Sequence, residues 1–234
     1  MVLFFMLLII VLVCVIKYAG YVNSTYYKIT KKPVLAMRTD VGSYGEYCIF
    51  KLLKSYESQG AKFLFNVYLP KGENETTEID VLMICSQGIY VFESKNYSGW
   101  IFGNEHQKYW TQLLAFGKQK HRFYNPVMQN AGHIQAIRQC LPNNPDIPIF
   151  SVIVFFGNSE FKNVTCNADN TFIIYPHSIR QVVADILLQP DANYGNKYEI
   201  MELFTTAVQN GDNSMIVSSQ ISSAIYHNLN RPHS

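Results

Sequence analysis

The segment from Glu78 to Asn104 constrains the fold most, because it contains two adjacent strand-like stretches with a turn between them. Residues 78–84 and 89–96 are rich in β-branched and aromatic side chains, which favour strands. Cys85-Ser86-Gln87-Gly88 lies between them, and Gly88 tolerates the positive φ that tight turns need. The sequence therefore predicts an antiparallel hairpin that leads into a third strand, near residues 100–103.

The register of this hairpin decides where its polar side chains point. With a turn of two or four residues centred on Ser86-Gln87, Asp80 lies opposite Glu93 on one face of the sheet. Lys95 returns to that face two residues later. A turn of three residues would shift the pairing by one and send Asp80 to the other face. We predict the even register, which brings Asp80, Glu93 and Lys95 together.

Two acids and a lysine at one end of an apolar hairpin have two interpretations. The first is a half-exposed salt bridge at the strand end, worth less than about 1 kcal/mol. The second is a divalent-metal site, in which Asp80 and Glu93 hold Mg²⁺ and leave positions for water and a phosphate. Without the metal, the two carboxylates would repel each other, and the pKa of one should rise.

The motifs around the hairpin resemble those of the NERD (nuclease-related domain) family, in the PD-(D/E)-x-K nuclease superfamily. The match covers roughly residues 40–155. The motifs that carry it are, in order, Gly45-Glu46, Glu78-Ile79-Asp80-Val81-Leu82, Gly88-Ile89-Tyr90-Val91, Glu93-Ser94-Lys95-Asn96, Ser98-Gly99, Trp110-Thr111-Gln112 and Asn125-Pro126-Val127-Met128-Gln129-Asn130. Ser94 departs from the family pattern, which usually has an apolar residue there.

The resemblance implies an α/β fold with a restriction-endonuclease-like mixed central sheet flanked by helices. It also implies a Mg²⁺-dependent nuclease, with Mn²⁺ as a possible substitute. Asp80, Glu93 and the carbonyl of Ser94 would hold the metal. Lys95 would orient the attacking water and help deprotonate it, or offset charge on the phosphate.

The resemblance also assigns roles to residues outside the hairpin. Glu46 would reach a metal position from the first helix, and Gln129 would hold water or phosphate. Trp110 and Gln112 would border the site. The residues themselves also allow simpler roles, because Glu46 can form a capping box with Ser43 as N-cap. Trp110 can be a core residue and Gln112 a surface amide.

Residues 125–140 are predicted to form a helix, with Asn125 as its N-cap and Pro126 at its first position. Gln129 and His133 lie four residues apart on this helix and share a face. We interpret His133 as an ordinary surface histidine. The apolar run at residues 149–156 predicts a strand that is buried on both faces.

The N-terminus predicts a membrane anchor. Residues 2–16 are all apolar, and residues 1–22 can cross a bilayer. A cleaved signal peptide is the alternative, but no basic segment precedes the apolar run and no small-x-small site follows it. Cations occur only after it, so the positive-inside rule places the soluble domain in the cytoplasm of a single-pass membrane protein.

The remaining chain divides into a basic linker (23–41), a nuclease-related α/β domain (42–190) and a C-terminal helical extension (191–234), with helices near 198–209 and 214–228. The net charge of +2 gives no sign of a broad basic face for nucleic acid. A polyanion would need a local cluster such as Lys118-Gln119-Lys120-His121-Arg122.

Missing motifs narrow the chemistry. The sequence has no C-x-x-C, H-E-x-x-H, G-x-G-x-x-G or G-x-S-x-G motif and no phosphate-binding loop, so zinc, nucleotide-cofactor and serine-hydrolase chemistry have no support. The leading hypothesis is a membrane-anchored, Mg²⁺-dependent nuclease that acts on DNA rather than RNA. The rival is a non-catalytic domain of the same fold that binds nucleic acid or a protein at the membrane. A metal-stabilised structural site without turnover is a third hypothesis.

Overall fold

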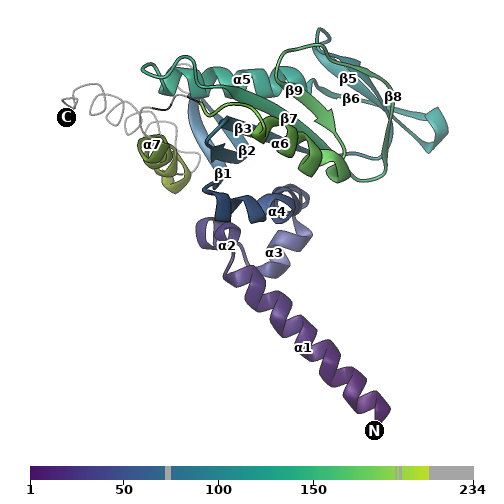
Figure 1. Ribbon diagram of the computed structural model, residues 1–234. Coiled ribbons are helices and arrows are strands. Elements are labelled where there is room, and N and C mark those ends of the chain that lie inside the picture. Colours follow the sequence, from purple (N-terminus) through teal and green to yellow (C-terminus); the bar gives the residue numbers. More distant parts are fainter. Residues whose placement is uncertain (72–74, 193, 195–196, 211–234) are drawn as a thin grey trace, which may run out of the picture.

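A computed structural model describes residues 1–71, 75–192, 194 and 197–210, and its strands form two mixed sheets (Figure 1). The central sheet has the order β1-β2-β3-β7-β9 and the second sheet the order β6-β5-β4-β8. The strands are β1 (Lys62–Lys71), β2 (Glu75–Cys85), β3 (Gly88–Asn96), β4 (Gly99–Asn104), β5 (Tyr109–Leu114), β6 (Gln119–Tyr124), β7 (Ile149–Phe156), β8 (Ser159–Thr165) and β9 (Thr171–Ile174).

Helices flank the central sheet on both faces. They are α1 (Val2–Val22), α2 (Thr25–Thr30), α3 (Val34–Thr39), α4 (Val41–Leu53), α5 (Pro126–Cys140), α6 (Ile179–Leu187) and α7 (Lys197–Asn210), with 3₁₀ turns η1 (Lys54–Gln59), η2 (Ala115–Gly117) and η3 (Pro176–Ser178). Apolar residues of α4 and α6 pack on one face, and those of α5 and α7 pack on the other. The predicted α/β class, a mixed sheet flanked by helices, is confirmed.

The hairpin of β2 and β3 has the even register. Ile84 pairs with Ile89 and Leu82 with Val91, and the pairing extends toward the open end as far as Val81 with Phe92. The backbone pairing ends there, and the Asp80 side chain instead accepts a hydrogen bond from the Ser94 backbone N–H. Gly88 has a φ of 150°, and a Cβ there would lie 2.4 Å from the carbonyl oxygen of Pro148. A larger residue would therefore separate β3 from the chain entering β7.

The expected third strand, β4, belongs to the second sheet rather than extending the hairpin. β3 runs parallel to β7, and their continuations β4 and β8 also run parallel. The chain turns between these strand pairs at Gly99 (φ 77°) and Gly157 (φ 81°). The sequence did not predict β6 and β8, because their residues are mostly polar and lack the apolar pattern of a buried strand.

The segment predicted as a basic linker instead folds into α2 and α3. Their residues Tyr26 and Met37 are buried in the core, which anchors the segment to the domain. Asp40, rather than the predicted Ser43, is the N-cap of α4, and its carboxylate accepts a hydrogen bond from the Ser43 backbone N–H at 3.0 Å.

α1 is long and apolar enough to cross a membrane, by its length and composition. The same properties suit a signal sequence. In Figure 1, α1 extends from the part of the domain that contains α2 and α3.

The helix predicted at 198–209 is α7, and its core packing places it within the folded domain. Ile200, Leu203, Phe204 and Ala207 are buried against the α5 face of the central sheet. The core thus continues beyond residue 190, where the domain was expected to end. The helix predicted at 214–228 lies outside the described residues.

Replacing Phe204 with alanine tests whether α7 belongs to the core. Phe204 is fully buried, so Phe204→Ala should lower the free energy of unfolding by about 3–5 kcal/mol. Urea unfolding of the full chain in detergent, followed by tryptophan fluorescence, measures this change. Leu188→Ala is the control, because Leu188 is 86% exposed and should change stability by less than about 0.5 kcal/mol. Equal effects of the two substitutions would contradict the packing of α7.

Candidate functional site

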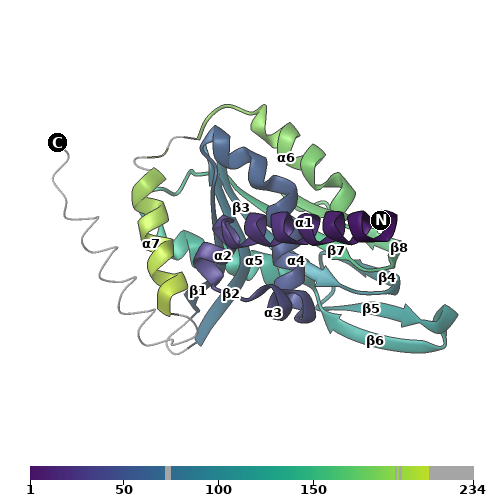
Figure 2. The same ribbon diagram turned by 90° about the horizontal axis from the view of Figure 1, so that it is seen from below.

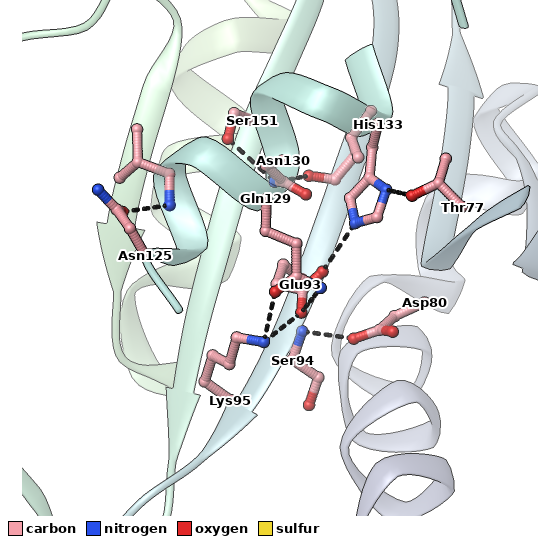
Figure 3. Close-up of polar contacts among 12 residues, drawn as sticks. Thr77, Asp80, Glu93, Ser94, Lys95, Asn125, Gln129, Asn130, His133 and Ser151 are labelled. Atoms are coloured by element: carbon pink, nitrogen blue, oxygen red, sulfur yellow. Dashed lines mark hydrogen bonds and ion pairs between the residues drawn. The ribbon is translucent and has the colours of Figure 1, made fainter. Parts of the chain in front are cut away.

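The candidate site lies where the end of β3 meets α5 and the middle of β2 (Figure 3). β3 supplies Glu93, Ser94 and Lys95, β2 supplies Asp80, and α5 supplies Gln129. Four of these five side chains make direct hydrogen bonds with another member of the group, and the backbone of Ser94 makes one as well. The residues predicted to form a site are thus brought together.

Glu93 is at the centre of the site. Its carboxylate is only 2% exposed. The oxygen Oε1 accepts hydrogen bonds from Lys95 Nζ at 2.6 Å and from Gln129 Nε2 at 2.8 Å. Lys95 Nζ also donates to Gln129 Oε1 at 2.9 Å, which closes a triangle of three side chains. A buried charge needs such partners, because an unpaired carboxylate loses several kcal/mol of hydration.

The other oxygen of Glu93 has a different environment. Oε2 lies 3.3 Å from His133 Nε2. Both atoms are buried, and neither makes a hydrogen bond of good geometry with another described residue. The second Glu93 oxygen is therefore at ion-pair distance from the His133 ring without a hydrogen bond of good geometry.

The interpretation of His133 as a surface residue was wrong. Its side chain is 3% exposed, and Nδ1 lies 2.8 Å from Thr77 Oγ1. The face of α5 that carries Gln129 turns toward the sheet, and His133 follows one turn later on that face. Thr77 precedes the residues predicted as the first strand of the hairpin, but β2 begins at Glu75 and places it beside the helix. The shared face with Gln129 was the sequence signal for His133, whereas Thr77 gave none.

Asp80 accepts a hydrogen bond from the Ser94 backbone N–H at 2.8 Å through Oδ2. Burial, and then the negative charge of Glu93, raise the pKa of Asp80 well above its ordinary value. Burial acts in the same direction on Glu93, but His133 and the ammonium of Lys95 outweigh it and lower the pKa of Glu93. The pKa values of the two acids are thus shifted in opposite directions, as expected when two like charges interact in unequal surroundings.

Glu46 is buried on α4 and does not form the capping box. Its carboxylate accepts hydrogen bonds from Tyr26 Oη at 3.2 Å and from Asn66 Nδ2 at 3.1 Å. Burial raises the pKa of Glu46, and its negative charge contributes to the raised pKa of Asp80. Asn66, which the sequence did not single out, adopts a φ of 51° on β1 and also donates to Glu78 at 3.1 Å.

Trp110 and Gln112 bond to backbone carbonyls in the second sheet. Trp110 is fully buried, its indole N–H donates to the Asn104 carbonyl at 3.0 Å, and its ring stacks on Phe155. Gln112 is largely buried, in contrast to the surface amide considered above, and donates to the Ser98 carbonyl at 2.7 Å. Among the hydrogen bonds and ring contacts of the described residues, neither side chain touches Glu93 or Lys95.

Two buried asparagines hold α5 in place. Asn125 caps the helix as predicted, accepting a hydrogen bond from the Val127 backbone N–H at 2.9 Å. Its amide donates to the carbonyl of Gln107 at 2.7 Å and to that of Asn104 at 3.0 Å. Asn130 donates to the Val91 carbonyl at 3.0 Å. The Asn130 bond holds the helix on β3, and the Asn125 bonds hold its start against the segment between β4 and β5, which places Gln129 against Glu93.

Residues 41–156, which include all of these polar groups except Tyr26, match the nuclease-related domain family, NERD. This part of the chain is a NERD domain. The predicted family is confirmed, and with it the PD-(D/E)xK nuclease-like superfamily.

Two further comparisons show similarity to proteins whose descriptions give no function. An uncharacterized Bacillus anthracis protein, pXO1-01, is 30% identical over 142 residues, which are 61% of this chain and 65% of the relative. The chain thus spans just under two thirds of that relative's length. The crystal structure of "Protein of Unknown Function AF1548" is 12% identical and covers 79% of this chain and 96% of its own. Its TM-score of 0.30 is too low to support an argument.

The chemistry of the NERD site suits a divalent cation. The charge of Glu93 raises the pKa of Asp80, and one buried oxygen of Glu93 lacks a hydrogen bond of good geometry. Within the described residues, no group of three or more His, Cys, Asp and Glu side chains is arranged for a metal. The donor set would therefore be two carboxylates and a backbone carbonyl, with water completing it, a set that Mg²⁺ commonly uses.

The pH dependence of stability tests the repulsion between Asp80 and Glu93. Because the pKa of Asp80 is raised on folding, the folded protein binds this proton more tightly. Its contribution to stability is present below the ordinary aspartate pKa and is lost as pH rises through the raised value. Asp80→Asn removes this loss, so the variant's stability relative to wild type should increase with pH when both are measured in EDTA.

Urea unfolding at a series of pH values gives the difference between the two proteins. Asp185→Asn is the matched acid-to-amide control, because Asp185 is exposed on α6. A difference between Asp80→Asn and wild type that stays constant or falls as pH rises would contradict the assignment.

Proposed function

We propose that this NERD domain is a metal-dependent phosphodiesterase that hydrolyses nucleic acid, with DNA preferred over RNA. The observation that supports it most strongly is the convergence of Asp80, Glu93 and Lys95, together with the second oxygen of buried Glu93, which makes no hydrogen bond of good geometry. A salt bridge at the surface would need neither the burial of Glu93 nor a second acid with a raised pKa.

The proposed cofactor is Mg²⁺, with Mn²⁺ as a substitute. Asp80, Glu93 and the carbonyl of Ser94 are the groups that would hold it. When bound, the ion would supply positive charge to a phosphate and lower the pKa of a water molecule. It would also relieve the repulsion that raises the pKa of Asp80.

The other side chains of the site would position the reacting groups and balance their charge. Lys95 provides an ammonium beside Glu93, where it can orient a water molecule and stabilise negative charge on a phosphate. Gln129 bonds to both Lys95 and Glu93 and so fixes their relative positions. His133, held by Thr77, lies against the second Glu93 oxygen and would keep that carboxylate oriented. Glu46 is close enough to influence the charge of Asp80 and is the candidate for a second metal position.

A non-catalytic role is the second candidate. Lys95 is bonded to two partners in the described structure, an arrangement that also suits a domain that keeps the fold and binds without turnover. Metal binding without cleavage would support this interpretation, or a structural metal site.

The test combines metal binding with cleavage by the full chain in detergent. Mg²⁺ or Mn²⁺ should raise the melting temperature of wild type and should not raise that of Asp80→Asn or Glu93→Gln, because each loses a charged ligand. Mg²⁺-dependent cleavage of plasmid, linear duplex and single-stranded DNA should fall at least about 100-fold in both variants and in Lys95→Met.

Asp185→Asn serves again as the control and should bind metal and cleave like wild type. Equal cleavage by wild type, Asp80→Asn and Lys95→Met would show a contaminating nuclease and reject the enzyme. Parallel assays with RNA test the preference for DNA.

We further propose that α1 is an uncleaved signal anchor that holds the domain at the membrane. The last turn of α1 supports this, because Tyr21 is 3% exposed and its hydroxyl donates to the Lys32 carbonyl at 2.7 Å. The Tyr21 ring also contacts Tyr47 of α4, with ring centroids 5.2 Å apart. Removing α1 would therefore remove a core residue. The cations that follow α1, including Lys28 and Arg38, support a cytoplasmic domain by the positive-inside rule.

Cysteine labelling tests this orientation. Leu35 is 75% exposed on α3, so Leu35→Cys should react with a membrane-impermeant maleimide only after intact cells are permeabilised. Wild type treated in parallel gives the background from the native cysteines. Labelling of Leu35→Cys in intact cells would place the domain outside.

A further inference from the structure

The hairpin of β5 and β6 forms a basic arm, defined as residues 108–124. Figures 1 and 2 show it extending from the rest of the domain as a two-stranded ribbon. The segment contains four cations, Lys108, Lys118, Lys120 and Arg122, and no acidic residue. The whole chain has a net charge of only +2, so the remaining residues are net negative. The basic arm is therefore the main concentration of positive charge on the described domain outside the N-terminal helices.

The two faces of the basic arm differ. Trp110 pairs with Phe123 on the face that packs into the domain, and both rings lie in the same aromatic cluster as Phe155. On the opposite face, Tyr109 pairs with Tyr124, the next outward pair contains Arg122, and the one after it contains Lys120. Lys120 and Arg122 are exposed, and within the described part of the chain neither forms an ion pair.

Exposed aromatic rings lie at both ends of this outward face. Tyr109 and Tyr124 are 49% and 44% exposed, and their rings meet edge to face at 6.3 Å. At the other end, Phe116 is 93% exposed in the turn between the strands. Accessible aromatic rings therefore lie on either side of the cations along the ribbon, over roughly 20 Å for six residues at about 3.3 Å each.

The turn residue Phe116 has an unfavourable backbone conformation in addition to its exposed apolar side chain. It adopts a φ of 55° and a ψ of 39°, and Gly117 follows with a φ of 91°. Two successive positive φ values are typical of a type I′ hairpin turn, where asparagine and glycine are preferred. A bulky side chain in the left-handed region is rare and strained, which is a reason to look for a function.

Protection of a sheet edge explains only part of this pattern. β6 is an edge strand, and charged side chains on such strands discourage pairing with another molecule. That role accounts for Lys120 and Arg122. It does not account for Phe116, because an exposed phenyl ring at a hairpin tip promotes association rather than preventing it.

We propose that the basic arm binds single-stranded nucleic acid, with cations of its outward face contacting phosphates and Phe116 stacking on an unpaired base. Cations together with accessible aromatic rings are what single-strand binding uses, because every base has a face that can stack. This inference rests on the proposed function in one respect only, which is that nucleic acid is the ligand of the NERD domain.

The position of the basic arm connects it to the candidate site. β6 ends at Tyr124, and Asn125 then begins α5, which presents Gln129 to Glu93. A strand bound along the arm would therefore reach the start of the helix that lines the site. In Figure 1, α1 leaves the lower side of the domain beside α2 and α3, whereas the arm lies at its upper right.

The experiment measures binding of a fluorescein-labelled oligothymidylate of about 12 nucleotides by anisotropy. The full chain is held in neutral phosphatidylcholine nanodiscs with EDTA, so that cleavage cannot occur. Phe116→Asn should weaken binding at least about fivefold while leaving the melting temperature unchanged or higher, because asparagine suits the turn. Phe116→Trp should retain binding, since it keeps an aromatic face.

Charge variants test the interaction with phosphates. The double variant Lys120→Gln/Arg122→Gln should weaken binding and reduce the dependence of log affinity on log salt by about 0.7 for each phosphate that is no longer neutralised. The matched control is Lys51→Gln/Lys54→Gln, which removes the same charge from exposed positions at the end of α4 and should change binding little. Duplex of the same length should bind more weakly than the single strand.

Three results would overturn the inference. One is equal binding by Phe116→Asn and wild type, and another is an equal decrease of affinity in the two double variants. The third is a blue shift of Phe116→Trp emission in phosphatidylserine-containing discs without any response to oligonucleotide, which would assign the arm to the membrane surface. Arm-dependent binding by a protein that shows no metal-dependent cleavage would support the arm and reject the nuclease, so the two proposals fail separately.

Discussion

The buried carboxylate of Glu93 is the interaction on which the site depends. A charge at that depth is tolerated because Lys95 and Gln129 hold one of its oxygens and His133 lies beside the other. These partners come from β3 itself and from two successive turns of α5. The position of α5 on the sheet is therefore as important to the site as the hairpin, and the hydrogen bonds of Asn125 and Asn130 maintain it.

The two acids of the site differ because their surroundings differ. Glu93 has a cation and a histidine nearby, whereas Asp80 accepts its hydrogen bond from one backbone N–H and its acidic neighbours repel its charge. An arrangement that is unfavourable without a cation becomes favourable when positive charge is added. In this sense, the raised pKa of Asp80 is the electrostatic basis of the proposed metal site.

Local patterns predicted the parts of the structure that local physics determines. The alternation in residues 78–96 gave the hairpin and its even register, and Asn125-Pro126 gave the start of α5. Long-range packing determined what the sequence missed. His133 looks like a surface residue until α5 is placed beside β2, and Thr77 looks like part of a loop until β1 pairs with it. The polar segments β6 and β8 form strands because β6 pairs with β5 and β8 pairs with β4. Residues 23–39 fold because Tyr26 and Met37 are buried in the hydrophobic core.

The burial of Tyr21 has a mechanical consequence. The apolar helix passes into α2 after only Asn23 and Ser24, and its last turn is packed among Tyr26, Tyr27 and Tyr47. With α1 in a bilayer, the domain would be connected rigidly to the membrane helix rather than through a flexible linker. Its working height and tilt would be set by the protein, so any long polymer it handles would have to approach the lipid surface at a fixed level.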